Sequence, residues 1–594
     1  MNKITKIKIF ILISLGITFT LFPIIHNNLN FNTKNRYISS ENNDRINPHN
    51  DFLRVSKYWE LTSPIEIDDT DPNNWTWAEG EAWFGGGNGT IANPYIIENV
   101  TINVNNNFDY CIRIQNSIKY FIIQNCTVLN ANLAGIFLGN VSNSKLIYNN
   151  ANNNYNGIRL YNSDDNNVSK NTANYNDYSG IYLYSSGKNN VSRNTANYNE
   201  YGIRLYNSYE NNISGNTVNY NDYYGIYLYS SGKNNVSRNT ASDNYYNGIR
   251  LYNSNKNNIS ENTISLNGAS GIYLDNSDDN TISRNTANDN YNGIRLYNSD
   301  DNNVSKNTAN YNEYGIRLYN SYENNISENT IQLNDWIGIY LDNSDDNTVS
   351  RNTANDYNPY GIRLYQSDYN TITNNTLRNH YWGIYLEKCD NNTITENNLN
   401  NNQLGIILGS SNRNNISGNT INDNDEYGIW LSSCYYNVVR FNIITNNDIG
   451  IYISYSYSNE ISNNSFNGNN VDIEQYIEPH LPIEVIIGFV AVMVIISVWV
   501  AMEIFYRKRG SRPRTKIFPL EKNRLPEKPI EETPPLKVER VEVTQEEVIP
   551  KSPEEQPEEF IPPEPQIIKC PFCGFNINEE MIFCPHCGNK FKKK

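Results

Sequence analysis

The stretch GIRLYNSDDNNVSKNTANYN, residues 157–176, decides the fold, because close copies of it recur along most of the chain. The Gly of each Gly-Ile-x-Leu motif, Gly-Ile-x-Ile in the last copy, marks 15 copies spaced 22 or 23 residues apart. A period this short excludes helical-pair repeats of about 33 residues and propeller blades of about 40. The markers stand at positions 135, 157, 180, 202, 225, 248, 271, 293, 315, 338, 361, 383, 405, 428 and 450.

Within one copy, apolar and polar residues alternate. Ile158 and Leu160 flank Arg159, and Val168 precedes Ser169 in the same way. A period of two predicts short strands with one buried face. Asn, Asp, Ser and Gly fill the intervals, and these residues tolerate the left-handed backbone of tight bends. The pattern predicts an all-β parallel solenoid with two or three short strands per coil and coils about 4.8 Å apart.

The repeats also resemble a known family. The pattern GIxLxxSxxNxISxNTI is similar to that of right-handed parallel β-helix repeats, in particular those of NosD-type proteins described as periplasmic copper-binding. Polysaccharide lyases and epimerases share this pectin-lyase-like fold. The resemblance covers residues 85 to 470 and implies a right-handed β-helix, a scaffold that carries many different activities.

The charge of the chain is unevenly distributed. The 594 residues carry a formal net charge of -16. Residues 507–594 hold 17 Lys or Arg and 15 Asp or Glu, so the rest of the chain holds 30 basic and 48 acidic residues. Nucleic-acid binding requires a basic footprint. We therefore expect no nucleic acid partner for the acidic part of the chain.

Two apolar segments predict a place in the cell membrane. Residues 1–26 contain three Lys residues followed by an apolar run, the layout of a signal peptide or signal anchor, with a buried core helix as the alternative. Residues 483–506 predict one transmembrane helix. Five Lys and Arg residues follow between 507 and 514, and such an excess marks the cytoplasmic side. We expect a single-pass protein with an extracellular β-helix and a cytoplasmic tail.

The tail has two parts. Residues 507–566 are rich in Pro and Glu and predict a disordered linker. Residues 567–594 contain two Cys-x-x-Cys motifs and resemble the short zinc ribbons found at prokaryotic protein termini. Four thiolates suit a structural tetrahedral zinc ion, and so short a segment has too little core to fold without metal. The predicted ligands are Cys570, Cys573, Cys584 and Cys587, in a ribbon whose cytosolic protein partner is unknown.

The solenoid needs a cover at its ends. Residues 85–475 are predicted to form the β-helix, and residues 27–84 form the N-terminal region that precedes it. An open stack exposes its apolar end unless another segment covers it. Trp75, Trp77 and Trp83 predict this cover, and a sugar-binding aromatic cluster is the alternative.

Two columns of side chains are expected to face outward from the repeats. The second residue after each Gly is most often Arg or Tyr, and Tyr is frequent two residues further on. Arg planes can lie on Tyr rings of the next coil, about 4.8 Å away, and each contact contributes about 0.5 to 1 kcal/mol. The columns either only stabilise the sheet or bind an acidic or neutral polysaccharide. The candidate binding residues in them are Arg159, Tyr182, Arg204, Tyr227, Arg250, Tyr273 and Arg295.

Residues 356–387 break the regular repeat and form a second candidate site. A polysaccharide-active enzyme needs a local cluster of acid, base and charge-stabilising groups, which the monotonous repeats elsewhere lack. Glu387 or Asp368 would be the acid or base here, near His380, and Trp382 a platform for stacking a sugar. The alternative is a repeat that has drifted locally.

Asn at the turns predicts a structural ladder. Asn171 and Asn194 are one coil apart, and stacked amides can hydrogen-bond along the rod. Sequons such as Asn167-Val168-Ser169 predict N-linked glycans on an external rod, although coils about 4.8 Å apart leave no room for one on each coil. The alternative is that turn geometry alone selects Asn at these positions.

The repeats offer weak evidence for metals. Paired carboxylates such as Asp278 and Asp279 lack the Asp-x-Asp-x-Asp loop of calcium sites and are better explained as solvated turn residues. Histidines never fall on adjacent coils and the chain has 4 Met, so the residues do not support the copper association of the NosD name. Cys389 and Cys434 are two coils apart, beyond disulfide reach.

These features predict a membrane-anchored surface protein whose β-helix binds polysaccharide or other envelope components, in adhesion or recognition. The alternative is a polysaccharide lyase, hydrolase or epimerase of the pectin-lyase-like fold. A passive structural spacer is the third possibility.

Overall fold

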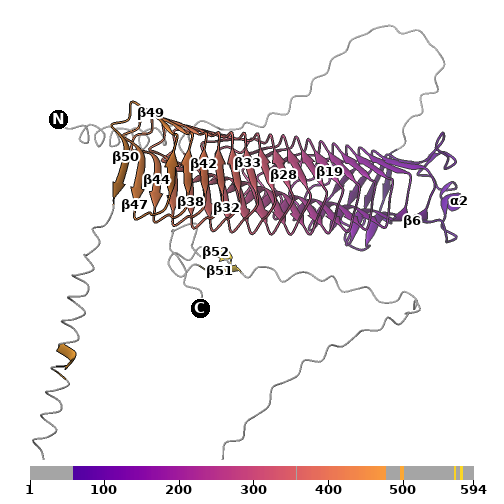
Figure 1. Ribbon diagram of the computed structural model, residues 1–594. Helices are drawn as coiled ribbons and strands as arrows, with labels where there is room; N and C mark the ends of the chain where they lie inside the picture. The colour runs from indigo at the N-terminus through magenta and orange to yellow at the C-terminus, as the bar shows by residue number, and fades with distance from the viewer. Residues whose placement is uncertain are drawn as a thin grey trace, which may run out of the picture. The chain divides into compact units, whose positions relative to one another are not determined.

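The computed structural model describes residues 58–355, 358–476, 496–498, 500, 567–569 and 576–578. Contacts divide the chain into two units, Met1–Ile486 and Ile487–Lys594. The first unit contains a right-handed parallel β-helix whose coils stack along one axis (Figure 1). The predicted all-β solenoid is therefore confirmed.

Each coil contributes to three parallel sheets, which we number in the order in which the chain reaches them after each marker Gly. Sheet 1 contains the Gly-Ile-x-Leu segments, sheet 2 the Asn-x-Ser segments and sheet 3 the segments that begin with Thr. The bends between them are called corner 1–2, corner 2–3 and corner 3–1. Each corner contains residues with positive φ, such as Asn162, Lys170 and Tyr175.

Sheet 1 consists of β2 (Ile65–Asp68), β6 (Tyr110–Ser117), β9 (Ala134–Val141), β12 (Asn156–Tyr161), β14 (Ser179–Tyr184), β16 (Tyr201–Tyr206), β18 (Tyr224–Tyr229), β21 (Asn247–Tyr252), β24 (Ser270–Asp275), β27 (Asn292–Tyr297), β29 (Tyr314–Tyr319), β32 (Ile337–Asp342), β35 (Tyr360–Tyr365), β38 (Trp382–Glu387), β41 (Leu404–Gly409), β44 (Tyr427–Ser432), β47 (Ile449–Ser454) and β50 (Val471–Tyr476).

Sheet 2 consists of β3 (Phe84–Gly86), which is antiparallel to the next strand, β4 (Tyr95–Glu98), β7 (Phe121–Gln124), β10 (Ser144–Ile147), β13 (Asn167–Ser169), β15 (Asn190–Ser192), β17 (Asn212–Ser214), β19 (Asn235–Ser237), β22 (Asn258–Ser260), β25 (Thr281–Ser283), β28 (Asn303–Ser305), β30 (Asn325–Ser327), β33 (Thr348–Ser350), β36 (Thr371–Thr373), β39 (Thr393–Thr395), β42 (Asn415–Ser417), β45 (Val438–Arg440) and β48 (Glu460–Ser462).

Sheet 3 is interrupted, because some coils contribute only an isolated bridge at Thr172, Thr195, Thr217 or Thr308. Its strands are β1 (Trp59–Leu61), β5 (Val100–Asn103), β8 (Thr127–Leu129), β11 (Asn150–Asn152), β20 (Thr240–Ser242), β23 (Thr263–Ser265), β26 (Thr286–Asn288), β31 (Thr330–Gln332), β34 (Thr353–Asn355), β37 (Thr376–Arg378), β40 (Asn398–Asn400), β43 (Thr420–Asn422), β46 (Ile443–Thr445) and β49 (Ser465–Asn467).

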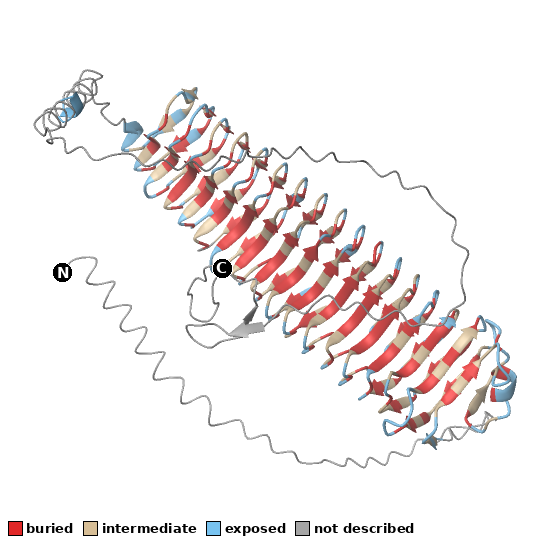
Figure 2. Ribbon diagram, turned by 90° about the horizontal axis from the view of Figure 1, so that it is seen from below, coloured by how far each residue is buried: buried red, intermediate tan, exposed pale blue. Residues whose placement is uncertain are grey.

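The core is a narrow column of Ile, Leu, Val and Ala side chains. Ile158, Leu160, Val168 and Ala173 are fully buried, and Figure 2 shows that buried residues run along the strands while exposed ones gather at the corners and ends. The marker Gly is required by close packing. A Cβ at Gly180 would lie 2.7 Å from the Ala196 Cβ and 2.8 Å from the Gly202 carbonyl oxygen.

The predicted Asn ladder is confirmed. The Asn171 side-chain amide donates to the Asn194 Oδ1 at 3.0 Å and to the Leu146 carbonyl at 2.8 Å, while the Asn171 backbone N–H donates to the same Oδ1 at 2.9 Å. In the other two corners, Asn166 donates a hydrogen bond to the Oδ1 of Asn189 in the next coil, and Asn176 donates to the Oδ1 of Asn199 in the same way. The ladders satisfy buried backbone N–H groups where the sheets end at corners.

Two of the three tryptophans predicted to cover the N-terminal end are buried. Trp75, in α2 (Trp75–Ala78), is 2% exposed, and its ring stacks on Tyr95 with centroids 4.6 Å apart. Trp83 is buried as well, but Trp77 is 36% exposed. The rod begins earlier than expected, since β1 and β2 lie before residue 85 and pair with β5 and β6.

Several predicted segments lie mainly outside the described residues: 1–26, 483–506, 507–566 and the zinc ligands within 567–594. In the part of the chain that the structure describes, no helix is long and apolar enough to cross a membrane. Of the predicted ribbon, the structure describes β51 (Ile567–Lys569) and β52 (Asn576–Asn578), which form an antiparallel pair.

Candidate binding face

The candidate face is the outer surface of sheet 1, where the register places the predicted Arg and Tyr residues side by side. Arg159 pairs with Tyr182, and Tyr182 pairs with Arg204. The same alternation continues through Tyr227, Arg250, Tyr273 and Arg295. The seven residues therefore form one column, which we call the Arg/Tyr column.

Arginine side chains of the column lie among tyrosine rings. The Arg204 guanidinium carbon is 5.0 Å from the ring centroids of Tyr178 and Tyr182 and 5.1 Å from that of Tyr201. The Arg295 guanidinium carbon is 5.0 Å from the Tyr273 centroid. Such contacts contribute about 0.5–1 kcal/mol when exposed and more when desolvated. Stabilisation of the sheet is thus one role of the column.

The column is more buried than the sequence suggested. Tyr182 is 2% exposed, and Arg204 and Tyr227 are each 8% exposed. The reason is a third set of side chains, directly before the marker Gly, that packs over the column: the Tyr201 ring stacks on Tyr227 with centroids 5.8 Å apart. Arg159, Arg250 and Arg295 remain half-buried. Tyr201 and Tyr224, 23 residues apart, mark this third set in the sequence, but their spacing alone does not show that the rings fold over the column.

The neighbouring tyrosine column is the more accessible one. The ring centroids of Tyr184 and Tyr206 are 5.0 Å apart, those of Tyr206 and Tyr229 are 4.8 Å apart, and both pairs are nearly parallel. Tyr161 and Tyr252 extend the stack at its two ends. Because each ring covers the face of the next, a ligand on this column would meet ring edges and hydroxyl groups.

Carboxylates replace tyrosine in this second column farther along the rod. The Asp275 carboxylate lies 3.1 Å from the Arg250 guanidinium, and the Glu387 carboxylate lies 3.1 Å from that of Arg363. Burial raises the pKa of Asp275 despite the nearby arginine. Burial also raises the pKa of Tyr273 to about 12, so its phenol stays protonated at neutral pH. Between β12 and β21 the two columns therefore carry arginines and tyrosines but no carboxylate.

The second predicted site is not assembled as a catalytic cluster. Trp382 stacks on Tyr385 with centroids 5.8 Å apart, close to Glu387 on the same strand. His380 is instead 3% exposed inside corner 3–1, with its ring nitrogens 2.7 and 3.1 Å from backbone carbonyls. The Asp368 carboxylate accepts a backbone N–H at corner 1–2. The structure thus separates these groups, while residues 356 and 357 lie outside the described residues.

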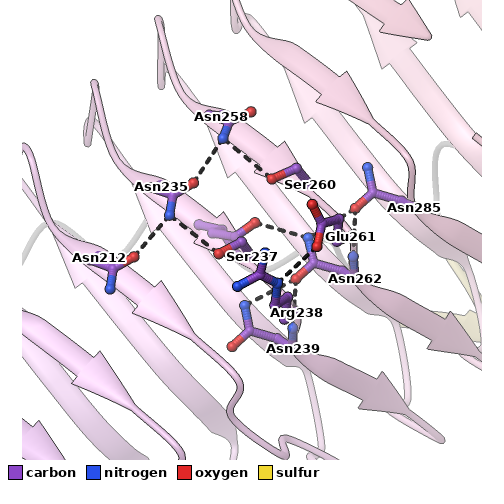
Figure 3. Close-up of polar contacts among 11 residues, drawn as sticks. Asn212, Asn235, Ser237, Arg238, Asn239, Asn258, Ser260, Glu261, Asn262 and Asn285 are labelled. Atoms are coloured by element: carbon purple, nitrogen blue, oxygen red, sulfur yellow. Dashed lines mark hydrogen bonds and ion pairs between the residues drawn. The ribbon is translucent and has the colours of Figure 1, made fainter. Parts of the chain in front are cut away.

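The predicted turn carboxylates have a structural function. The carboxylates of Asp345, Asp368 and Asp390 each accept the backbone N–H of the residue one coil further on, at 2.7 Å. The sequon residues also form contacts (Figure 3): the Asn235 amide donates to the Asn212 Oδ1 at 2.8 Å and to the Ser237 hydroxyl at 3.2 Å. Glycosylation of these sequons stays a prediction.

The described residues do not fit a copper ion. Among them, no group of three or more His, Cys, Asp and Glu side chains could hold a metal. Both ring nitrogens of His380 face backbone carbonyls. Cys111, Cys126, Cys389 and Cys434 are buried free thiols, and burial raises the pKa of Cys389 to about 12. A thiol protonated this firmly is a poor metal ligand.

Family comparisons agree with the fold. The family model described as "Periplasmic copper-binding protein (NosD)" matches residues 87–213, 173–288 and 268–404, which together span more than half of the chain. A model described as "Right handed beta helix region" matches residues 337–477. The chain therefore belongs to the NosD family of β-helix proteins. No curated protein matches the sequence.

Solved structures that resemble the chain include the Dettilon tailspike protein, with 14% identity, a TM-score of 0.29, and 62% of each chain covered. The A-module of the mannuronan C-5 epimerase AlgE4 from Azotobacter vinelandii has 13% identity and a TM-score of 0.28, with 64% of this chain and 89% of that one covered. DFA-IIIase from Arthrobacter chlorophenolicus has 12% identity and a TM-score of 0.31, with 53% and 94% covered.

Proposed function

We propose that this protein is a cell-surface receptor or adhesin whose sheet 1 binds a polysaccharide of the cell envelope or of another surface without cleaving it. The observation that carries the proposal is the outer face of β12 to β27, where arginine and tyrosine alternate from coil to coil and a second column of stacked tyrosines runs from β12 to β21. An extended polymer can contact such a face at several weak points, and linked weak contacts gain avidity.

The chemistry of the face favours hydrogen bonding to sugar hydroxyl and carboxylate groups. The tyrosine edges supply phenol groups, and the half-buried Arg159, Arg250 and Arg295 supply guanidinium groups. Catalysis would instead need a few finely positioned groups at one place. The separation of His380, Asp368 and Glu387 supports binding over catalysis.

An enzyme acting on polysaccharides is the second candidate. The feature that favours it is the strand β38, where Trp382, Tyr385 and Glu387 lie together and Arg363 pairs with the carboxylate. A sugar could stack there beside an acid. Glu387 would be the acid or base of such an enzyme.

We also propose that the β-helix lies outside the cell and the tail in the cytoplasm, joined by one membrane helix in residues 483–506 and a linker in residues 507–566. The Lys and Arg residues between 507 and 514 support this orientation. Protease added to intact cells should digest the β-helix and leave the tail protected. A protected β-helix would contradict the orientation.

We further propose that Cys570, Cys573, Cys584 and Cys587 hold one structural zinc ion in a ribbon that binds a cytosolic protein. Two Cys-x-x-Cys motifs are the supporting observation. The full-length protein should contain one zinc ion per chain, and Cys584→Ser should remove it. Zinc content unchanged by that substitution would show that the ligands are wrongly assigned.

Binding by sheet 1 can be tested on a glycan array with the full-length protein. Tyr206→Phe, Tyr229→Phe and Tyr252→Phe together remove hydroxyl groups but keep the stacked rings. Loss of three hydrogen bonds of about 0.5–1.5 kcal/mol each should weaken binding about 10-fold or more. Tyr175→Phe, Tyr198→Phe and Tyr220→Phe form the matched control, because those rings stack at corner 3–1 instead. An equal loss of glycan affinity in both variants would show that the outer face of sheet 1 is not the binding site.

A further inference from the structure

A second surface feature lies at corner 2–3, between residues 157 and 351. The residue thirteen positions after each marker Gly points outward there, and it is basic in six of nine successive coils. We call these side chains the basic ridge. Its members are Lys170, Arg193, Arg238, Arg284, Lys306 and Arg351, interrupted by Gly215, Glu261 and Glu328, and all nine positions are exposed.

The ridge stands out because the rest of this region is acidic. Of the 21 Asp and Glu residues between 157 and 351, only Glu261 and Glu328 lie on the ridge. The others lie on sheet 1 or at the other two corners. The strands of sheets 2 and 3 that flank the ridge, from β13 to β33 and from β20 to β34, carry only Asn, Thr, Ser and Gln as polar residues. The ridge is thus a cationic line between two neutral, hydrogen-bonding surfaces.

Local backbone geometry does not explain the basic residues. Their φ angles lie between 54 and 59°, in the left-handed region where Gly and Asn are strained least. Later coils place Asn374, Gly418 and Asn463 at the same position, and Glu396 and Phe441 in the two other coils, so none of the later coils has a basic residue there. Long cationic side chains therefore occupy sites where the fold alone would favour smaller residues.

The ridge is only partly neutralised. Arg238 pairs with Glu261 at 2.8 Å, and Glu328 lies 3.6 Å from Lys306 and 3.8 Å from Arg351. Within the described residues, Arg193 and Arg284 form no ion pair with a carboxylate. Six cations against two carboxylates leave a net charge of +4 on an otherwise acidic rod.

We propose that the basic ridge is a second binding site, separate from sheet 1, for a linear polyanion whose carboxylate, sulfate or phosphate groups repeat along the chain. The cations recur at multiples of about 4.8 Å, so several can contact one extended polymer at once. The amides and hydroxyls of sheets 2 and 3 flank the ridge within reach of the sugar or backbone oxygens of such a polymer.

A second copy of this chain is the competing occupant, because corner 1–2 carries carboxylates at the same spacing, among them Asp278, Asp300 and Asp345. Two convex corners would bury little area, and exposed ion pairs alone contribute little. A flexible polymer can follow the ridge and contact both flanking sheets. The geometry therefore favours the polymer.

The test uses the full-length protein and four probes: polygalacturonate, dextran sulfate, polyphosphate and neutral dextran. The ridge variant combines Arg193→Asn, Arg238→Asn and Arg284→Asn, since Asn suits the left-handed backbone. The control combines Lys188→Asn, Lys233→Asn and Lys256→Asn at corner 1–2, where φ is 55, 58 and 63°. The two variants thus remove equal charge from equivalent backbone sites.

We expect the unmodified protein to bind at least one polyanion, but not dextran, with an affinity that falls as salt rises. The ridge variant should bind about 10-fold more weakly, and the control should stay within about 2-fold of the unmodified protein. The Tyr206, Tyr229 and Tyr252 to Phe variant should bind polyphosphate, which has no sugar hydroxyl or carboxylate groups, as strongly as the unmodified protein does, and this result separates the ridge from sheet 1.

Three results would overturn the proposal. One is the absence of binding to every polyanion, and another is an equal loss in the ridge and control variants, which would indicate bulk charge. The third is self-association, measured by sedimentation, that the ridge variant abolishes while polyanion binding is unchanged. That outcome would identify a second copy as the occupant. Circular dichroism on each variant would show that the β-helix is intact.

Discussion

Asn235 and Asn239 lie four residues apart in one coil, yet they belong to different regions of the molecule (Figure 3). Asn239 is 1% exposed inside corner 2–3, where its amide donates to the Ile213 carbonyl at 2.9 Å and to the Asn262 Oδ1 at 3.0 Å. Asn235 is on the outer surface of sheet 2, where its amide contacts Asn212 and Ser237 and water can replace either partner. Both belong to ladders, but only the inner one replaces hydrogen bonds that water cannot supply.

This difference explains which parts of the repeat can vary. The inner position is Asn in coil after coil, as at Asn216, Asn239 and Asn262, because each amide must match the ones before and after it. The outer position changes to Thr at Thr281 with no break in the strand pairing. The inside of the rod determines the fold, and the outer columns and corners are free to acquire binding residues.

The largest expected effect comes from breaking the register of the inner columns. Deletion of the whole coil 225–247 should leave a folded rod that is one coil shorter, because Gly248 then follows Tyr224 in the same register. Deletion of residues 225–235 alone should prevent folding of the coils beyond it, since their inward side chains lose their partners. Circular dichroism and thermal unfolding of the full-length proteins would compare the two. Equal damage by both deletions would contradict the coil-by-coil account.

A smaller but direct comparison uses the two asparagines themselves. Asn239→Ala leaves buried partners without hydrogen bonds, and we expect it to lower the free energy of unfolding by about 3 kcal/mol. Asn235→Ala should lower it by less than about 1 kcal/mol, because solvent can satisfy the exposed partners. Chemical denaturation measures both. Similar losses at the two positions would show that the outer ladder is as important to the fold as the inner one.

His380 provides a third test, because it interrupts an inner Asn ladder. It occupies the position of Asn358 and Asn402 in the adjacent coils, and the buried Asn358 Nδ2 has no hydrogen-bond partner among the described residues. His380→Asn supplies an Oδ1 acceptor there and should raise the free energy of unfolding by about 0.5–1.5 kcal/mol. A loss of stability instead would mean that the histidine contacts with the Ala354 and Asn358 carbonyls matter more than ladder continuity.

The sequence predicted the features that depend on the repeat period. It did not predict those that depend on how neighbouring columns of side chains pack against each other. The marker Gly and the alternation in residues 157–176 were enough for the solenoid and the Asn171 ladder. The burial of Tyr182 and Tyr227 depends on which way Tyr201 and its neighbours fold over the sheet, and spacing alone does not define that direction. The repeat spacing was enough to predict that His380 occupies a ladder position, because His380 aligns with Asn358 and Asn402 in the adjacent coils.

The candidate site at residues 356–387 illustrates the same limit. Nearness in sequence suggested one cluster, but the successive segments of a coil lie on different sheets and corners. Glu387 lies on sheet 1, Asp368 at corner 1–2 and His380 inside corner 3–1. In a solenoid, residues one coil apart are neighbours, and residues ten apart within a coil are often not.

A receptor and an enzyme differ in whether the polysaccharide that the full-length protein binds is also changed by it. Binding would be titrated with the intact protein and with the Tyr206, Tyr229 and Tyr252 to Phe variant, and the same mixtures assayed for new reducing ends and unsaturated sugars. We predict binding that weakens in the variant, with no products from either protein. Products that form with the intact protein and disappear with Glu387→Gln would contradict the account and identify an enzyme.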